Sequence, residues 1–279
     1  MNQNIVIVGL GLIGGSLAKA FQKYSDCRVT GIDKNPDVIT AAVNSGAILR
    51  QATPEDLQRA DIVFLCLYPQ ADIDFLQEHA AHMRPGCVVT DVSGVKSALC
   101  SRLSEIAARH GLVYIGGHPM AGKEKSGFEN SEADLFQGAS YILVPCGAPQ
   151  SAIDLMTAIA LKLGFGSTVL ATPEEHDRKI AFTSQIPHVL ACAYVKSPQC
   201  PGHAGFSAGS YRDVSRVASV DETMWAELFL DNRVALTEEL DTLIGNLQEI
   251  RDAIDNGDAE TLRSLLREGR LVKERLGEA

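Results

Sequence analysis

The stretch Ile5–Gly14, I-V-I-V-G-L-G-L-I-G, decides the fold of this 279-residue chain. Its four β-branched residues predict a strand that is buried on both faces, because such strands are almost continuously apolar. Glycines follow at the spacing G-x-G-x-x-G, and a helical pattern begins directly behind them. This order of strand, glycine turn and helix is typical of a dinucleotide-binding α/β unit.

Each glycine of the turn has its own physical purpose. Gly9 allows the tight turn, Gly11 lets the backbone approach a pyrophosphate, and Gly14 permits close packing of helix on strand. The free N–H groups and the positive dipole end of the following helix attract phosphate. We therefore expect the nucleotide to bind along the whole turn: Gly9, Leu10, Gly11, Leu12, Ile13 and Gly14.

Asp33 follows the second predicted strand, about 20 residues beyond the glycine turn. Its carboxylate can accept hydrogen bonds from ribose hydroxyls and repels a 2′-phosphate, which favours NAD over NADP. The neighbouring Lys34 is the one residue that would tolerate a phosphate. Leu67 and Tyr68 come at the carboxyl end of the third predicted strand, where ligands bind in such sheets, so we expect both in the nucleotide site. A glycine turn that binds no ligand is the alternative.

Short β-branched runs alternate with helical stretches up to about residue 145. The predicted strands are 5–8, 28–32, 62–67, 88–91, 113–115 and 141–144. This rhythm predicts a doubly wound, Rossmann-type α/β domain over residues 1–147. The breaker cluster Pro145–Pro149 marks its end.

Residues 148–279 are predicted to form an all-helical substrate and dimerisation domain, with one further strand at 167–170. Leucine and isoleucine recur at steps of three and four from Leu236 to Ile254, on a long helix predicted over 221–256. So long an apolar stripe with little else to cover it favours a homodimer through these helices. A core helix of the same domain is the alternative.

The composition excludes several classes of partner. A net charge of −10 argues against nucleic acid and anionic membranes, and an anionic substrate would need a local basic cluster. The seven cysteines are scattered and form no C-x-x-C pair, so neither a disulfide framework nor a metal site is indicated. No signal peptide or membrane-spanning run is visible, so we expect a cytoplasmic protein.

Glycine-rich polar segments follow the later predicted strands. G-G-H-P-M-A-G begins at Gly116 and continues into K-E-K-S-G, and I-P-H ends at His188. R-D-V-S-R ends at Arg216, nine residues ahead of Trp225, the only tryptophan. His118, held between glycine and proline, has no helix or strand periodicity that would bury it.

Behind a dinucleotide fingerprint, these segments resemble the prephenate/arogenate dehydrogenase family over nearly the whole chain. The resemblance implies a NAD-dependent oxidative decarboxylation in tyrosine biosynthesis. Hydride leaves the ring carbinol carbon of prephenate, and loss of the ring carboxylate as CO2 gives 4-hydroxyphenylpyruvate. His118 is implied to accept a hydrogen bond from the ring hydroxyl, which requires a neutral imidazole. A locally bonded turn residue is the alternative for His118.

The resemblance also implies substrate-binding residues. Arg216 matches a carboxylate-binding arginine, and a guanidinium suits bidentate recognition of a carboxylate. Lys123 is a weaker cationic candidate. His188 matches a histidine near the substrate side chain, and Trp225 matches a residue that closes the site of a neighbouring subunit. A surface salt bridge, a buried helical histidine and a core tryptophan are the respective alternatives for Arg216, His188 and Trp225.

Glu124 and Asp177 match positions of a gating ion network at the site entrance, with solvated charges as the alternative. Relatives commonly carry serine where this chain has Gly94, directly before V-K. Ser93 lies one position earlier, and neighbours in an extended segment point to opposite sides. Ser93 is a catalytic candidate, and a backbone amide or a local rearrangement are other replacements for the displaced serine.

Three alternatives to a prephenate dehydrogenase remain. Arogenate bears an amine where prephenate has a keto group and is the close alternative substrate. A β-hydroxyacid or imine dehydrogenase leaves the G-G-H-P segment unexplained. A catalytically silent, dinucleotide-binding regulatory protein is disfavoured because His118 and Arg216 are intact. The length predicts a minimal enzyme without a fused chorismate mutase or regulatory domain.

Overall fold

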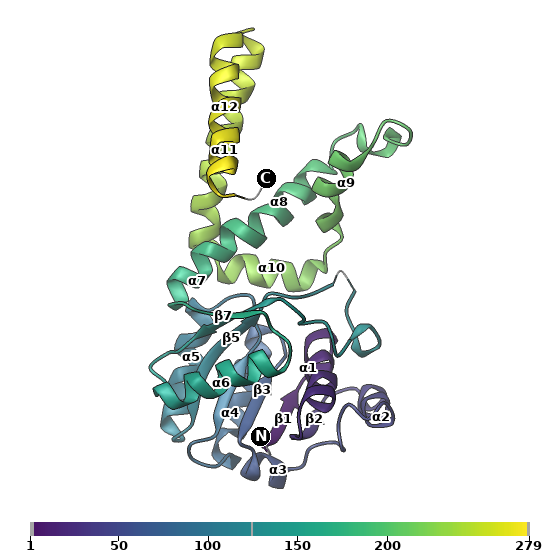
Figure 1. Ribbon diagram of the computed structural model, residues 1–279, viewed down its shortest axis with the longest axis vertical. Coiled ribbons are helices and arrows are strands. Elements are labelled where there is room, and N and C mark those ends of the chain that lie inside the picture. The colour runs from purple at the N-terminus through teal and green to yellow at the C-terminus, as the bar shows by residue number, and fades with distance from the viewer. Residues whose placement is uncertain (1–2, 124, 278–279) are drawn as a thin grey trace. The chain divides into compact units, whose positions relative to one another are not determined.

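The computed structural model describes residues 3–123 and 125–277, and one seven-stranded sheet organises its first part (Figure 1). In chain order the strands are β1 (Asn4–Val8), β2 (Arg28–Ile32), β3 (Ile62–Leu65), β4 (Val88–Asp91), β5 (Val113–Pro119), β6 (Ser140–Val144) and β7 (Ser167–Leu170). Their order across the sheet is β2-β1-β3-β4-β5-β6-β7. Only the β5–β6 pair is antiparallel among these strands.

Six helices accompany the sheet: α1 (Leu12–Tyr24), α2 (Pro36–Asn44), α3 (Pro54–Arg59), α4 (Pro69–His79), α5 (Ser97–Arg109) and α6 (Gln150–Lys162). Alternate residues of β1 enter two apolar clusters. Ile5 packs in the same cluster as Phe21 of α1, and Val6 packs in the same cluster as Leu103 of α5. Successive side chains of a strand point to opposite faces, so both faces of the sheet are covered. The predicted doubly wound fold is confirmed.

Strand β5 is longer than predicted and includes the glycine-rich segment. His118 pairs with Ile142 of β6, so it is a strand residue and not part of a loop. The neighbouring glycine is required by close packing: a Cβ at Gly117 would lie 2.4 Å from Tyr141 Oη and 2.6 Å from the Asp91 carbonyl oxygen. Glycine, usually a sign of a turn, here allows a strand to pack tightly.

The sheet also continues past the boundary that we predicted at residue 147. Cys146 and Gly147 have positive φ angles of 51° and 81° and turn the chain from β6 into α6. Behind α6, β7 pairs with β6, with Tyr141 opposite Thr168. The breaker cluster is therefore a loop inside the α/β part, and the region without strands begins after Leu170.

Helices follow the last strand. They are α7 (Pro173–Ile180), the π-helical turn η3 (Ala181–Gln185), α8 (Ile186–Tyr194), α9 (Gly209–Ser215), the 3-10 turn η5 (Arg216–Ala218) and α10 (Glu222–Asp231). The chain up to Asn232 forms one compact unit. Asn232 ends α10 and is buried, and its side-chain amide donates to the Asp177 carbonyl oxygen and to Gln185 Oε1. The single helix predicted over 221–256 is therefore interrupted at this residue.

Residues Arg233–Ala279 form a second unit, which contains α11 (Arg233–Asp255) and α12 (Ala259–Arg275). Gly257, at φ 64°, turns the chain, and Asp258 caps α12 by accepting from the Glu260 and Thr261 amides. Along α11, Leu247 and Ile254 are 50% and 61% exposed in the single chain. None of the helices in the described ranges is long and apolar enough to cross a membrane.

Candidate active site

The glycine turn between β1 and α1 has the tight geometry that its spacing predicts. Gly9 has φ 87°, and a Cβ there would lie 2.5 Å from the Cys66 carbonyl oxygen. A Cβ on Gly14 would lie 1.9 Å from the Gly9 carbonyl oxygen. Larger residues at either position would push the loop, β3 and α1 apart, so the glycines are required by packing.

The amino end of α1 fits a dinucleotide pyrophosphate. A Cβ on Gly11 would meet no atom within 4 Å, which leaves room for a ligand to approach the backbone. Gly11 provides no side-chain cap, and the first turn of α1 carries no acidic residue. The uncapped N–H groups and the positive end of the helix dipole favour a phosphate at this point.

Asp33 lies beside this turn. Its Oδ2 accepts the Leu10 amide at 2.8 Å and its Oδ1 accepts the Asn35 amide at 2.9 Å. A carboxylate has further lone pairs, so Asp33 can also accept from ribose hydroxyls. At the end of β3, Leu67 Cδ2 would lie 2.7 Å from a Cβ on Gly9, and the 47% exposed Tyr68 precedes α4. Asp33 and Leu67 therefore lie against the glycine turn, and Tyr68 follows Leu67 directly in the chain.

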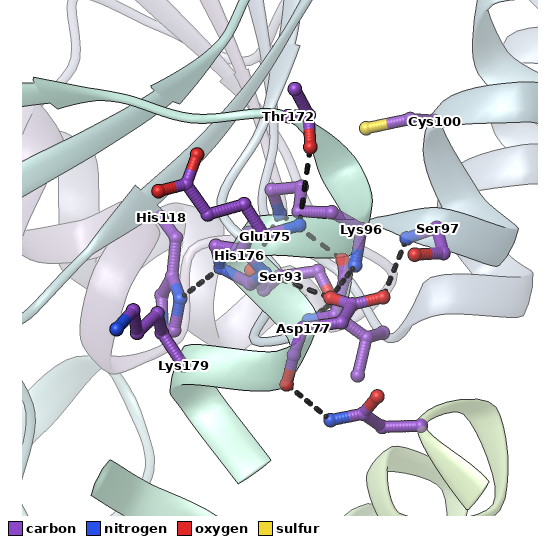
Figure 2. A network of polar contacts seen from close by, with 12 residues as sticks. Ser93, Lys96, Ser97, Cys100, His118, Thr172, Glu175, His176, Asp177 and Lys179 are labelled. Carbon is purple, nitrogen blue, oxygen red and sulfur yellow. Dashed lines mark hydrogen bonds and ion pairs between the residues drawn. The ribbon is translucent and has the colours of Figure 1, made fainter. Parts of the chain in front are cut away.

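His118 at the carboxyl end of β5 begins a row of three hydrogen-bonded side chains (Figure 2). His118 Nδ1 lies 2.8 Å from Nε2 of His176, and His176 Nδ1 lies 2.8 Å from Oδ1 of Asp177. His176 and Asp177 are adjacent on α7 and only 1% and 4% exposed. The row therefore joins a strand of the sheet to a helix whose histidine lies 58 residues further along the chain.

Asp177 is anchored at the amino end of α5. Its two carboxylate oxygens accept the Lys96 and Ser97 backbone amides, each at 2.8 Å. These amides are among the unpaired donors of the first turn, so the carboxylate caps the helix and is stabilised by its dipole. In this single chain Asp177 is 4% exposed and its carboxylate caps α5, and the gating role stays a prediction.

This row of contacts fixes the tautomer of His118. A carboxylate only accepts hydrogen bonds, so His176 Nδ1 carries the hydrogen. The Nε2 of neutral His176 is then an acceptor, and His118 Nδ1 must be the donor of the bond between the rings. His118 Nε2 is therefore left with a lone pair, and a Cβ on Gly94 would lie 3.9 Å from it.

The pKa shifts agree with two neutral histidines and a charged carboxylate. Burial is the main cause that holds the pKa of His118 well below 6.5, and the nearby Lys96 charge and the interaction with His176 lower it further. Burial also lowers the pKa of His176, against the opposing effect of Asp177. Burial acts to raise the pKa of Asp177, but hydrogen bonds from His176 and Ser97 outweigh it and lower that pKa. His118 Nε2 is therefore an acceptor at neutral pH.

Lys96, whose backbone amide donates to Asp177, also forms a fully buried ion pair. Lys96 Nζ lies 2.7 Å from Asp91 Oδ2, and both side chains are 0% exposed. Asp91 Oδ1 also accepts from the Tyr114 hydroxyl at 2.7 Å and from the Gly117 amide at 3.2 Å. Loss of one partner of such a pair typically costs roughly 3–5 kcal/mol, because the other charge is left unpaired. The bonds from Tyr114 and Gly117 to Asp91 join β4 to β5, the strand that carries His118.

Ser93 belongs to the turn after β4. Its amide donates to Asp91 at 2.9 Å, and its Oγ accepts the Val95 amide at 3.4 Å. Gly94 is the residue that lies beside the His118 ring, where its Cβ would come within 3.8 Å of Cε1. Leu228 of α10 lies on the same side, 3.8 Å from that position. The serine hydroxyl thus stabilises its own turn, and the backbone of Gly94 faces the histidine.

His188 and Trp225 lie together. Their rings stack with centroids 3.8 Å apart, and His188 Nδ1 donates to the Ser184 carbonyl oxygen at 2.8 Å. The helix of Trp225, α10, is tied to η3 by Gln185 Nε2, which donates to the Leu228 carbonyl oxygen at 3.2 Å. Within this single chain, Trp225 therefore contacts the histidine that we predicted to lie near the substrate.

Three predicted site residues remain, Arg216, Lys123 and Glu124. Arg216 is exposed at the start of η5, which packs against α8, the helix of His188. Lys123 Nζ lies 2.6 Å from Glu132 Oε1, so its charge is already paired. Glu124 lies outside the described residues. No cluster of three or more potential metal ligands occurs within residues 3–123 and 125–277.

Sequence reasoning missed His176, Lys96 and Asp91. The only local signal for His176 was its position directly before Asp177, in a helix that begins with Thr172 as its cap and Pro173. Nothing in that helix shows that its first turn meets a strand that ends 54 residues before the helix begins. Lys96 and Asp91 stood in the D-V-S-G-V-K segment, but a pair of charges in a loop resembles an exposed ion pair.

Comparisons with known proteins agree along the chain. A family model described as prephenate dehydrogenase, nucleotide-binding domain, matches residues 17–169, and one described as prephenate dehydrogenase, dimerization domain, matches residues 172–268. Cyclohexadienyl dehydrogenase of Zymomonas mobilis is 32% identical over 97% of this chain and 95% of its own. Prephenate dehydrogenase of Bacillus subtilis is 30% identical over 94% of this chain and 73% of its own.

Solved structures agree with these relatives. Prephenate dehydrogenase from A. aeolicus, in complex with hydroxyphenyl propionate and NAD+, has a TM-score of 0.88 at 27% identity and covers 99% of both chains. Arogenate dehydrogenase from Synechocystis has a TM-score of 0.83 at 27% identity, over 98% of this chain and 99% of its own. The fold and the site thus define a nucleotide-binding oxidoreductase. The chain belongs to the prephenate dehydrogenase family, and the predicted resemblance is confirmed.

Proposed function

We propose that this protein catalyses the NAD-dependent oxidative decarboxylation of prephenate to 4-hydroxyphenylpyruvate. The observation that carries the proposal is the row His118–His176–Asp177, which leaves a neutral acceptor nitrogen at the carboxyl end of β5. The glycine turn follows β1, which is parallel to β5 in the same sheet. The carboxyl ends of parallel strands share one edge, where α/β sheets bind their ligands.

The nucleotide would be held by the glycine turn and Asp33. Gly11 and the amino end of α1 suit the pyrophosphate, and Asp33 suits the adenosine ribose of NAD. When bound, NAD+ supplies the hydride acceptor of the reaction. Lys34 is exposed beside Asp33, and the carboxylate nevertheless disfavours a 2′-phosphate at this point.

His118 acts on the ring hydroxyl of the substrate. Its Nε2 accepts the hydroxyl hydrogen bond and polarises the O–H bond as hydride leaves the same carbon. The bond to the ring carboxylate then breaks, CO2 leaves, and the electron pair of that bond completes the aromatic ring. A protonated His118 cannot accept this bond, so the low pKa of its imidazole keeps the site competent at neutral pH.

The central test is a comparison of kcat/KM for prephenate and arogenate, each with NAD and with NADP. We expect NADH formation from prephenate, and a lower KM for NAD than for NADP because of Asp33. The relatives include proteins named prephenate, arogenate and cyclohexadienyl dehydrogenases, so arogenate is the second candidate substrate. Absence of turnover with all four pairs would contradict the proposal, and a higher kcat/KM for arogenate would transfer it to that substrate.

Arg216 is proposed to bind a substrate carboxylate. Prephenate carries two carboxylates, and a chain of net charge −10 needs a local cation to capture them. A hydrogen bond to a charged group is worth about 1.5–3 kcal/mol, so Arg216→Ala should raise KM by roughly 10- to 150-fold. Arg212→Ala, on the exposed face of α9, is the matched control. Equal KM values for Arg216→Ala and the wild type would remove this role.

Gly94 provides a test of the space beside His118. A Cβ there would meet only ordinary contacts at 3.8–3.9 Å, so Gly94→Ser should fold and place a hydroxyl next to His118 Nε2. We expect kcat to change less than about tenfold, since the variant adds one neutral hydrogen bond. Gly94→Ala is the control without the hydroxyl.

We expect Ser93→Ala to lower thermal stability more than kcat, because the Ser93 hydroxyl stabilises the turn after β4.

The proposed enzyme is a homodimer. The match to a dimerization-domain model supports this assembly, as do the exposed apolar side chains of α11, Ile244, Leu247 and Ile254. Burying these side chains against a second copy of the chain would stabilise the dimer by roughly 25 cal/mol for each Å2 of apolar surface removed from water. A monomeric mass by light scattering at micromolar concentration would contradict this assembly.

A further inference from the structure

Cys100 and Cys146 are neighbouring thiols close to β5, the strand of His118. Cys100 lies on α5, and Cys146 follows β6, two residues beyond the Val144 that pairs with Gly116. Cys146 packs against the apolar cluster that contains Cys100, and each of the two thiols shifts the pKa of the other. Cys100 Sγ would lie only 2.9 Å from a Cβ on Gly116, so the absence of that Cβ gives the pair its space.

The surroundings of Cys146 stabilise its thiolate. The Cys100 thiol, the Ser104 hydroxyl and the Gly116 backbone N–H each act to lower the pKa of Cys146. The effect of Cys100 is the largest and outweighs burial, and the pKa of Cys146 falls to about 7. The same interaction, with burial, raises the pKa of Cys100. One thiol is therefore the nucleophile and the other keeps its proton.

Cys146 is also accessible and held in an unusual conformation. It is half-buried and lines a surface hollow of about 430 Å3 with Val144, Leu170, Thr172 and Glu175. It has φ 51° and is the only non-glycine residue with a positive φ angle in the described part of the chain. Such a conformation costs roughly 1–3 kcal/mol and occurs preferentially at functional sites.

We propose that Cys146 is a modification site for small hydroperoxides, with Cys100 as the resolving thiol. The Cys146 thiolate attacks the peroxide O–O bond, which forms the sulfenic acid S–OH and releases an alcohol or, from hydrogen peroxide, water. The Cys100 sulfur then attacks this sulfenic sulfur, the disulfide forms, and the hydroxyl leaves with the Cys100 proton as water. Two sulfur atoms together lose two electrons, and these electrons reduce the peroxide.

The position of the pair couples it to the catalytic row. Gly116 lies two residues before His118 on β5, and Cys100 Sγ lies 3.6 Å from the Tyr114 hydroxyl, which donates to Asp91. Glu175, at the hollow, directly precedes His176. A disulfide would fix α5 to the loop after β6 beside these contacts, so we expect it to lower turnover. This effect on turnover rests on the proposed function, whereas the thiol chemistry does not.

The thiol chemistry is tested by alkylation and peptide mapping of the reduced full-length protein at pH 7. At that pH a thiol of pKa about 7 is half ionised, whereas an ordinary thiol of pKa about 8.5 is ionised to only a few per cent. Iodoacetamide should therefore modify Cys146 roughly tenfold faster than the half-buried Cys192 and Cys200. Equal rates at these three cysteines would overturn the proposal.

Hydrogen peroxide then tests the resolving step. One equivalent should produce a Cys100–Cys146 disulfide, which Cys146→Ser prevents and the control Cys192→Ser retains. Persistence of both thiols, or over-oxidation of Cys146 without a disulfide, would overturn the role of Cys100.

Turnover of the oxidised protein should fall and recover with dithiothreitol, while Cys146→Ser keeps its turnover through the same treatment. Unchanged turnover after complete disulfide formation would overturn the coupling. A protein that forms the disulfide but shows no dehydrogenase turnover even when reduced would contradict the proposed function alone.

Discussion

Replacing His118 by asparagine is expected to lower kcat by roughly 10²–10⁴-fold, the usual contribution of a positioned acid–base group. Asparagine lacks a basic nitrogen, so the ring hydroxyl loses its acceptor. The glycine turn and Asp33 are unchanged, so the Kd of NAD should remain within about twofold of the wild-type value. Stopped-flow kinetics and NAD titration by fluorescence measure the two effects separately.

His110→Asn is the matched control for this variant. His110 is exposed at the carboxyl end of α5, so its replacement should leave both kcat and NAD affinity unchanged. Wild-type turnover in His118→Asn would end the assignment of His118. Loss of turnover together with loss of NAD binding would point to a folding defect, which a thermal melt of the same sample reveals.

Replacing His176 by leucine should produce the second large loss. His118 Nδ1 then loses its acceptor, so nothing holds the hydrogen on Nδ1. The ring can then carry the hydrogen on Nε2 instead, and Nε2 no longer offers a lone pair to the substrate. The lost hydrogen bond is the one that His118 donates while positive charge develops on its ring. A hydrogen bond that involves a charged group is worth about 1.5–3 kcal/mol, which corresponds to roughly a 10- to 150-fold loss in kcat. KM for prephenate should change little, because His176 is 1% exposed and presents almost no surface to a ligand.

Glutamine at position 176 distinguishes positioning from packing. Its carbonyl oxygen can accept from His118 Nδ1, so His176→Gln should recover much of the turnover lost in His176→Leu. Equal turnover in the two variants would contradict the positioning role. Asp177 keeps its bonds to the Lys96 and Ser97 amides in both variants, so α5 should remain capped and the fold intact.

The pH dependence follows from the same row. The pKa of His118 is held well below 6.5, so its acceptor nitrogen is unprotonated throughout the neutral range. Activity is lost as pH falls through this lowered pKa, since the protonated ring cannot accept. We therefore expect kcat/KM, whose pH profile reports the free enzyme, to stay level from about pH 8 down to 6.5 and to fall only well below that. A fall centred at pH 6.5 or higher would contradict the shift.

The parts of the site that local sequence determines were predictable. The glycine turn is one continuous segment, and the packing demands at Gly9 and Gly14 follow from its spacing alone. Asp33 was predictable because it lies at a fixed distance from that turn in one βαβ unit. The sequence also singles out His118 as a chemical candidate. It does not predict that His118 lies in a strand, because glycine and proline usually mark turns.

The rest of the site depends on tertiary contacts. His176 and Asp177 meet His118 and the amino end of α5 only after α7 has packed beside the sheet. The charge of Asp177 and its place in the sequence do not show that it caps α5, because the Lys96 and Ser97 amides that it accepts lie about 80 residues earlier. That the sheet continues past residue 147 is hidden for a related reason: the turn at Cys146 and Gly147 resembles a linker in the sequence, and only the pairing of β7 with β6 shows that it lies within the sheet region.

The most direct test of the proposed reaction uses prephenate that carries deuterium on the ring carbinol carbon. Mass spectrometry of the products formed with NAD+ should find one deuterium in the reduced nucleotide, with CO2 and 4-hydroxyphenylpyruvate in equal amounts. Reduced nucleotide without deuterium, or no reduced nucleotide at all, would contradict hydride transfer from the carbon whose hydroxyl His118 is proposed to bind.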